Sequence, residues 1–235
     1  MKIEILYPEI ANLYGDLYNA EYLARSCGAE IVRTKLGERP RFTQEDIALV
    51  SLSGTTERGQ EIVRDALRPW VEALDRRTEQ GGVTLVTGNA LELFGEYILL
   101  DDGSKIPMLG RFPIHSERHL LSRYNALYLG ELEGMKIVGF KGQFGHSYGE
   151  NGAGLFRTIR GAGLNPENPA EGIREGNLMM TYLLGPITVL NPPFTRYLLS
   201  LMGVEDPRPA LEKTAMEVYE RRVRDFEDPK RGYEY

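Results

Sequence analysis

The clearest chemical arrangement in this sequence lies between Gly81 and Gly95, in the run GGVTLVTGNALELFG. A β-rich apolar run over residues 83–87 ends in a Gly-Asn pair and passes directly into an amphipathic segment, residues 90–94. This pattern predicts a strand, a tight turn and the start of a helix. It is the geometry of a nucleophile elbow, in which a Ser or Cys at the tip attacks a carbonyl group and the next helix's N–H groups stabilise negative charge. The tip here is Gly88, so we expect no nucleophile at that position.

Thr87, a segment with two histidines, and the single cysteine could also carry chemistry. Thr87 has a hydroxyl, but it lies one residue before the tip, so its side chain should point away from it. His115, Glu117 and His119 would place two histidines on one face of a helix, as in a metal site, yet they follow Pro113 and lack a third ligand. We therefore interpret them as a surface segment and predict no metal.

The single cysteine, Cys27, falls at the end of a predicted helix, where the helix dipole disfavours a thiolate. We interpret it as a structural thiol. A chain with one cysteine can form no internal disulfide, which agrees with a reducing compartment.

Alternating elements predict the fold around the elbow. Period-two apolar runs indicate short strands, and 3.6-residue periodicity indicates helices between them, with Pro69 breaking or kinking the second helical stripe. We expect a three-layer, flavodoxin-like α/β fold, with a mostly parallel sheet and helices on both faces. The predicted strands cover residues 2–7, 30–34, 47–51, 83–87 and 178–184, and the helical segments cover residues 19–27 and 62–74.

The second half of the chain has a different pattern. Residues 125–130 and 135–140 should form antiparallel strands, and a glycine-rich stretch over residues 139–154 indicates loops packed closely over a surface. We expect helices over residues 193–202 and 209–226, and a loose tail over residues 228–235. Without an internal repeat or linker, residues 1–235 are predicted to form a single domain.

Composition limits the partners of the protein. The 235 residues carry a formal net charge of −6, and no basic block outweighs its acidic surroundings, which argues against nucleic acid. No apolar run reaches the length of about 18 residues that a membrane span needs, and the sequence shows no signal-peptide pattern. We expect a cytoplasmic protein.

Taken together, these stretches resemble the class I glutamine amidotransferases, specifically the cobyric-acid-synthase branch. Within it, the chain is most similar to the glutaminase subunit of lipid II isoglutaminyl synthase, a peptidoglycan-related enzyme. The resemblance covers nearly the whole chain and implies the three-layer amidotransferase fold. It depends on Asn12-Leu13-Tyr14-Gly15-Asp16 with Asn19, on Asp46-Ile47 into Ser53-Gly54, on residues 81–95, on Ile137-Val138-Gly139-Phe140, and on residues 181–186.

The resemblance also shows what is missing. The family elbow reads Cys-Gly-Gly-Tyr-Gln, and its counterpart here begins with Gly88. The family's catalytic His, in Thr-Tyr-Leu-His-Gly-Pro, corresponds to Leu184, and its glycine-rich oxyanion loop corresponds to residues 51–53. Asp16, placed like the acidic partner of the His, and Arg123 are retained. The resemblance thus implies a vestigial pocket without catalytic residues, formed by Asp16, Gly54, Asn89, Arg123, Gln143, His146 and Tyr182.

Thioester-mediated amide hydrolysis needs a nucleophile, a base and an oxyanion site, and all three are altered. We therefore expect no intrinsic glutaminase activity and no cofactor. The resemblance implies a catalytically degenerate subunit that acts as a scaffold or regulatory partner of a Mur-ligase-like, ATP-dependent amide synthetase. Two alternatives stay open: a small-molecule binding or sensing module that uses the remodelled pocket, and an enzyme with non-standard residues such as Asp16, Gln143 and His146.

Overall fold

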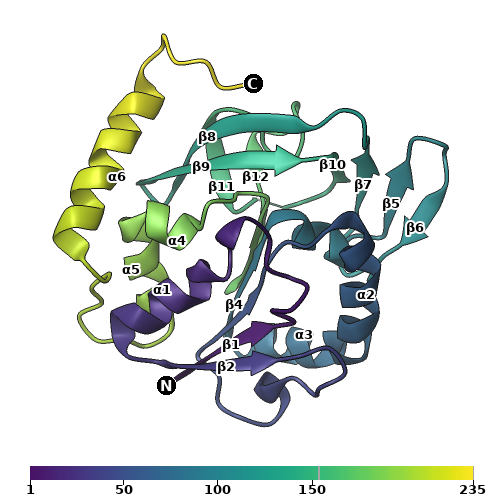
Figure 1. Ribbon diagram of the computed structural model, residues 1–235, viewed down its shortest axis with the longest axis horizontal. Coiled ribbons are helices and arrows are strands. Elements are labelled where there is room, and N and C mark those ends of the chain that lie inside the picture. The colour runs from purple at the N-terminus through teal and green to yellow at the C-terminus, as the bar shows by residue number, and fades with distance from the viewer. Residues whose placement is uncertain (153, 235) are drawn as a thin grey trace.

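A six-stranded sheet forms the centre of the molecule in the computed structural model, which describes residues 1–152 and 154–234 (Figure 1). All neighbouring strands are parallel except the first pair, β13 and β14, which is antiparallel. The mostly parallel sheet predicted from the alternating pattern is therefore confirmed. In spatial order the strands are β13 (Ile173–Glu175), β14 (Leu178–Thr181), β4 (Val83–Thr87), β3 (Leu49–Leu52), β1 (Lys2–Leu6) and β2 (Glu30–Thr34).

Helices cover both faces of this sheet, as predicted. Figure 1 shows α1 (Tyr18–Cys27), α4 (Ile187–Leu190) and α5 (Pro192–Leu201) on one side. On the other side lie α2 (Glu57–Leu67) and α3 (Val71–Glu79). A short 3₁₀ turn containing Pro69 separates α2 from α3, because proline cannot supply the N–H that a continuous helix needs.

Strand alternation divides the apolar side chains between two cores. Ile3 and Ile5 pack with Leu23 of α1 on one face of the sheet. Leu52 and Val86 pack with residues of α2 and α3 on the other. Each layer therefore buries one stripe of its helices against one face of the strands.

Two smaller sheets extend the second half of the chain. One contains β10 (Gly145–Gly149), β7 (Ile114–Arg118), β5 (Tyr97–Leu100) and β6 (Lys105–Pro107). The other contains β12 (Ala170–Glu171), β11 (Phe156–Arg160), β8 (Tyr124–Leu132) and β9 (Met135–Gln143). The antiparallel pairing predicted around residues 125–140 is confirmed as the β8–β9 hairpin.

The C-terminal helix α6 (Glu212–Glu227) packs against the second small sheet through Tyr219 and Phe226. It begins three residues later than predicted, because Leu211 has a positive φ of 55° that is incompatible with the helix. The late strand also ends earlier than predicted, at Thr181.

The segment over residues 228–234, where the sequence predicts a loose tail, makes contacts with the body of the fold. The Tyr233 carbonyl accepts a hydrogen bond of 2.7 Å from the Leu127 N–H of β8, and the Arg160 guanidinium donates to the Asp228 and Arg231 carbonyls. The Tyr233 ring lies under the same guanidinium. An aromatic anchor therefore fixes this segment, while Tyr235 lies outside the described residues.

Within the described ranges, every helix is too short or too polar to cross a lipid bilayer.

Candidate functional site

The predicted elbow is present at the carboxyl end of β4. Gly88 has a φ of 64°, in the left-handed region that favours glycine, and it opens the 3₁₀ helix η4 (Gly88–Phe94). The strand and turn are as expected, whereas the segment after them is a 3₁₀ helix rather than the first turn of an α-helix. The backbone of a nucleophile elbow is thus formed around a residue without a side chain.

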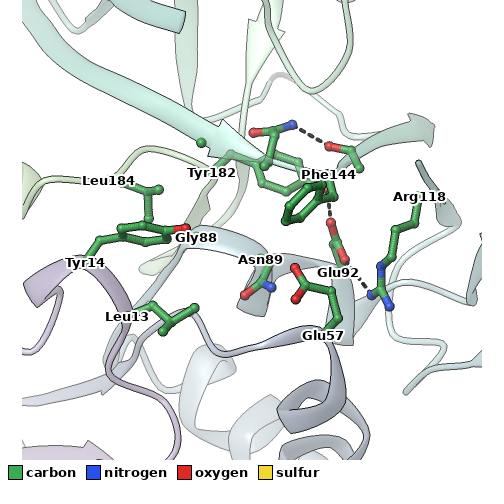
Figure 2. A pocket seen from close by; sticks show the side chains of 14 residues that line it. Leu13, Tyr14, Glu57, Gly88, Asn89, Glu92, Arg118, Phe144, Tyr182 and Leu184 are labelled. Carbon is green, nitrogen blue, oxygen red and sulfur yellow. Dashed lines mark hydrogen bonds and ion pairs between the residues drawn. The ribbon is translucent and has the colours of Figure 1, made fainter. Parts of the chain in front are cut away.

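Leu184 covers the tip of this elbow (Figure 2). A Cβ at Gly88 would lie 3.1 Å from Leu184 Cδ2 and 3.3 Å from the Gly54 Cα. Leu184 is held there by a hydrogen bond of 3.0 Å from its N–H to the Phe140 carbonyl. A methyl group of Leu184 therefore stands beside the elbow tip, and Gly88 itself supplies no nucleophile.

The cavity beside the elbow is small. Its volume of 30 Å³ has room for about two water molecules, whereas small-molecule sites are typically larger than about 300 Å³. The residues that line it are Leu13, Tyr14, Gly54, Glu57, Gly88, Asn89, Glu92, Arg118, Gly142, Gln143, Phe144, Gly145, Tyr182 and Leu184.

A buried polar network occupies one end of the cavity (Figure 2). Glu92 of η4 accepts hydrogen bonds from Gln60 Nε2 at 2.8 Å and from the Tyr182 hydroxyl at 3.1 Å. Arg118 of β7 lies 3.4 Å from the same carboxylate and donates to Gln60 Oε1. All four side chains are buried. Burial raises the pKa of Glu92, and the nearby Arg118 charge opposes that shift.

Asn89 ties the elbow to the loop after β3. Its Oδ1 accepts a hydrogen bond of 2.9 Å from the Thr55 N–H, and its Nδ2 donates to the Thr55 carbonyl at 2.7 Å. The Asn89 carbonyl in turn accepts from Gln60 Nε2 at 2.8 Å. The Thr55 N–H, which points from this loop toward the elbow, is therefore already bonded to the Asn89 side chain.

Asp16 is buried near the elbow, and no cationic side chain among the described residues pairs with it. It is fully inaccessible, and neither carboxylate oxygen makes a hydrogen bond of good geometry. Burial raises the pKa of Asp16 to about 7, although the Thr87 hydroxyl and the Gly185 N–H oppose the shift. Thr87 itself is buried, so its hydroxyl faces Asp16 inside the fold instead of a substrate.

The predicted pocket residues divide into two groups. Gly54, Asn89, Gln143 and Tyr182 line the cavity, whereas the other three do not. Arg123 is exposed and lies over the rings of Tyr14 and Phe144 at 5.5 and 5.4 Å from their centroids.

His146, of β10, lies 3.5 Å from Gln143 Nε2 through its Nδ1 and packs edge-on against Tyr124. Burial, followed by the Lys141 charge, lowers its pKa. Among the described residues, no hydrogen bond joins Asp16 to Gln143 or His146, so the three do not form a hydrogen-bonded catalytic group.

The His115-Glu117-His119 segment lies on and just after strand β7, not on a helix. His115 stacks between Tyr97 and Tyr148, and His119 bonds Asp101 at 2.6 Å. In the part of the chain that the structure describes, no group of three or more His, Cys, Asp or Glu side chains is arranged to hold a metal.

Cys27 is half-buried at the end of α1, and its thiol donates to the Leu23 carbonyl. Burial raises the pKa of the thiol, which agrees with a structural role.

Sequence reasoning missed Gln60, Glu57 and Arg118 as site residues and gave no role to Glu92. A signal for Glu92 was available, because it interrupts an apolar segment directly after the elbow and a buried acid there requires partners. No local pattern pointed to Arg118, which reaches the site from a strand 26 residues further along the chain.

Comparison with known proteins agrees with this geometry. Two lipid II isoglutaminyl synthase (glutamine-hydrolyzing) GatD subunits are similar to the chain. The one from Streptococcus pneumoniae (strain ATCC BAA-255 / R6) is 24% identical over 81% of this chain and 76% of its own length. The one from Staphylococcus aureus (strain N315) is 27% identical over 80% of this chain and 78% of its own length.

Solved structures share the fold. A glutamine amidotransferase crystal structure superposes with a TM-score of 0.56 at 18% identity, covering 86% of this chain and 99% of the other. A glutamine amidotransferase from Thermotoga maritima gives a TM-score of 0.54 at 12% identity, covering 94% and 92% of the two chains. At these identities the likeness establishes the architecture alone.

A family model for the CobB/CobQ-like glutamine amidotransferase domain matches residues 2–191, more than half of the chain. The predicted resemblance to the class I amidotransferases and their cobyric-acid-synthase branch is thereby confirmed. The elbow, the parallel sheet and this match lead to one conclusion: the chain belongs to the CobB/CobQ-like glutamine amidotransferase family.

Proposed function

We propose that this protein is a catalytically degenerate glutaminase-like subunit. It binds a Mur-ligase-like, ATP-dependent amide synthetase as a scaffold or regulator and hydrolyses no glutamine itself. Residues 1–235 act as a single domain in this proposal, and the complex works in the cytoplasm on a peptidoglycan precursor. The GatD relatives support the choice of synthetase class.

The observation that carries the proposal is the elbow tip. Gly88 has no side chain, and Leu184 packs over it. A thioester mechanism needs an attacking thiol, a base within hydrogen-bond reach and free oxyanion donors. Because such groups act as a unit, the loss of the first removes most of the rate, and later losses carry little further penalty.

The cavity volume disfavours the alternative of a sensor that uses the remodelled pocket. Leu184 and the Glu92 network leave a cavity of only 30 Å³ beside the elbow. The alternative of an enzyme based on Asp16, Gln143 and His146 loses support as well, because no hydrogen bond among the described residues joins Asp16 to either of the other two.

Reconstitution with the synthetase tests the proposal. The synthetase from the same organism would be purified with and without this chain, and amide product would be measured with ammonium chloride or with glutamine as nitrogen donor. We expect the chain to co-purify with the synthetase and to raise ammonium-dependent amidation, while glutamine alone supports none.

Two outcomes would contradict the proposal. A synthetase that neither binds the chain nor changes its rate excludes the partner role. Glutamine-dependent amidation by the complex excludes degeneracy. The Gly88→Ala variant serves as a control, because it alters the vestigial elbow and should leave ammonium-dependent amidation unchanged if the elbow has no catalytic part.

A further inference from the structure

A second and larger hollow lies between α6 and the β8–β9 hairpin, and it shares no lining residue with the cavity at the elbow. Its volume of 550 Å³ falls in the range of roughly 300 to 1,000 Å³ that small-molecule sites occupy. Phe140, Leu190 and Val218 provide apolar walls, and Phe140 and Val218 remain 36% and 49% exposed. We call this hollow the α6 groove.

The charge of the α6 groove is opposite to that of the whole chain. Arg221, Arg222 and Arg231 line it together with a single acidic residue, Asp225. Asp225 already pairs with Arg231 at 3.1 Å. Two positive charges thus remain in a protein whose formal net charge is −6.

Neither Arg221 nor Arg222 forms a salt bridge or side-chain hydrogen bond with another described residue. Arg222 is half-buried, and burial lowers its pKa without any acidic group to oppose the shift. A guanidinium that is partly withdrawn from water without an anion is unfavourable, and a bound carboxylate, sulfonate or phosphate would relieve this.

We propose that the α6 groove binds a small organic anion with an aromatic or aliphatic body. Arg221 and Arg222 hold the anionic head, and Phe140, Leu190 and Val218 pack against the body. Guanidinium groups suit this task because their planar N–H donors match the oxygens of such heads. The site is separate from the glutaminase-like cavity, so it stands whether or not the proposed function is correct.

A ligand in the α6 groove would lie close to the elbow, because the residues at the bottom of the groove adjoin Leu184. Gly185 lines the groove and follows Leu184 directly, and the Phe140 carbonyl accepts the Leu184 N–H. Gly185 has a φ of 89°, and a Cβ there would collide with the Phe140 ring, so the floor requires glycine. A ligand that moved Phe140 would therefore act directly on the residue that covers Gly88.

Fluorescence titration of the full-length chain with 8-anilinonaphthalene-1-sulfonate tests the proposal, since this dye joins an aromatic body to a sulfonate. At fixed ionic strength we expect saturable one-to-one binding. The Arg221→Gln/Arg222→Gln double variant should bind roughly tenfold more weakly, because charge-assisted hydrogen bonds to the head are lost. Val218→Glu should weaken binding as well by adding a negative charge to the wall.

Matched controls separate the groove from general dye binding. Arg224→Gln removes the same charge from an exposed position of α6 outside the groove and should change the affinity by less than about twofold. N-phenyl-1-naphthylamine, a neutral analogue, should bind more weakly and be insensitive to the arginine substitutions. Thermal melts would confirm that each variant folds.

The proposal is overturned if the wild-type chain shows no saturable dye binding, or if removing both arginines leaves the affinity unchanged. It is also overturned if the neutral analogue binds as tightly as the sulfonate, because the groove would then be a merely apolar surface.

Discussion

At the residue scale, Gly88 occupies a left-handed conformation that a residue with a side chain adopts only at a penalty of about 1–2 kcal/mol. An active elbow bears that strain because it exposes the nucleophile. With glycine at the tip the strain disappears, and Leu184 can pack against the backbone. In the proposed function, Gly88 and Leu184 would be substitutions that relieve strain at the cost of catalysis.

We predict that Gly88→Ala lowers the free energy of unfolding by more than Gly28→Ala, with losses of about 2 and 1 kcal/mol. Both glycines have a positive φ, 64° and 69°, but only the Cβ at Gly88 would meet neighbouring atoms. Urea denaturation of the two variants measures the difference. Equal losses would show that Leu184 does not press on the elbow tip.

Asp16 predicts a pH dependence of stability. Its pKa of about 7 in the folded protein is above the ordinary value of 3.8, so the folded state binds this proton more tightly than the unfolded state. The contribution of this group to stability therefore falls as the pH rises from about 4 to about 7 and is constant above that. The free energy of unfolding of Asp16→Asn, taken relative to that of the wild type, should therefore be about 2 kcal/mol higher at pH 8 than at pH 5.

Denaturant unfolding at both pH values checks this prediction. Asp102 provides the control, because Ser104 hydrogen bonds lower the pKa of this exposed carboxyl. Its Asn variant should not gain stability relative to the wild type as the pH rises. An Asp16→Asn effect that is equal at pH 5 and pH 8 would mean that the carboxyl stays ionised in the folded protein.

At the element scale, the Glu92 network joins four parts of the chain: Gln60 from α2, Glu92 from η4, Arg118 from β7, and Tyr182 just after β14. It links the central sheet to the first small sheet beside the elbow. Buried ion pairs of this kind add little net stability, but breaking one leaves a charge without compensation.

We predict that Arg118→Met lowers the free energy of unfolding by about 3 kcal/mol, and that adding Glu92→Gln recovers most of the loss because the buried charge is then absent. Arg157→Met is the surface control. Arg157 pairs with Glu131 at 2.9 Å but is 65% exposed, so its loss should stay below about 1 kcal/mol. A double-mutant cycle measures the coupling energy between Arg118 and Glu92. If Arg118→Met lowers the free energy of unfolding by no more than Arg157→Met does, the two side chains do not form a buried ion pair.

Local patterns were sufficient to predict the elements that carry the elbow. The periodicity of apolar side chains predicts the strand over residues 83–87. The backbone preferences of glycine and proline predict the turn at Gly88 and the break at Pro69. These properties depend only on neighbouring residues. The filling of the pocket could not be predicted in this way. It depends on Arg118 and Glu92 meeting across 26 residues, and on how far Leu184 reaches over Gly88.

The C-terminal segment is a second feature that local sequence patterns could not predict. Its composition is that of a loose end, yet Tyr233 and the carbonyls before it meet Arg160 and β8. Those contacts depend on the position of a sheet formed about a hundred residues earlier, which no pattern within the tail describes.

At the scale of the whole molecule, the chain keeps the architecture of a glutamine amidotransferase, and the cavity beside its elbow has a volume of 30 Å³. The family match covers residues 2–191, and the solved amidotransferase structures cover most of the chain. A fold does not by itself determine an activity, which depends on the residues of the site. This is the basis for proposing a subunit that supports a synthetase and supplies no ammonia.

Glutamate release from glutamine, measured for the purified chain alone and in complex with the synthetase, tests the central claim most directly. We predict a rate no higher than that of the buffer in both cases, and no change on substitution of Asp16, Gln143 or His146. Glutamate release well above the buffer rate that is abolished by one of these substitutions would contradict the claim and establish a working glutaminase.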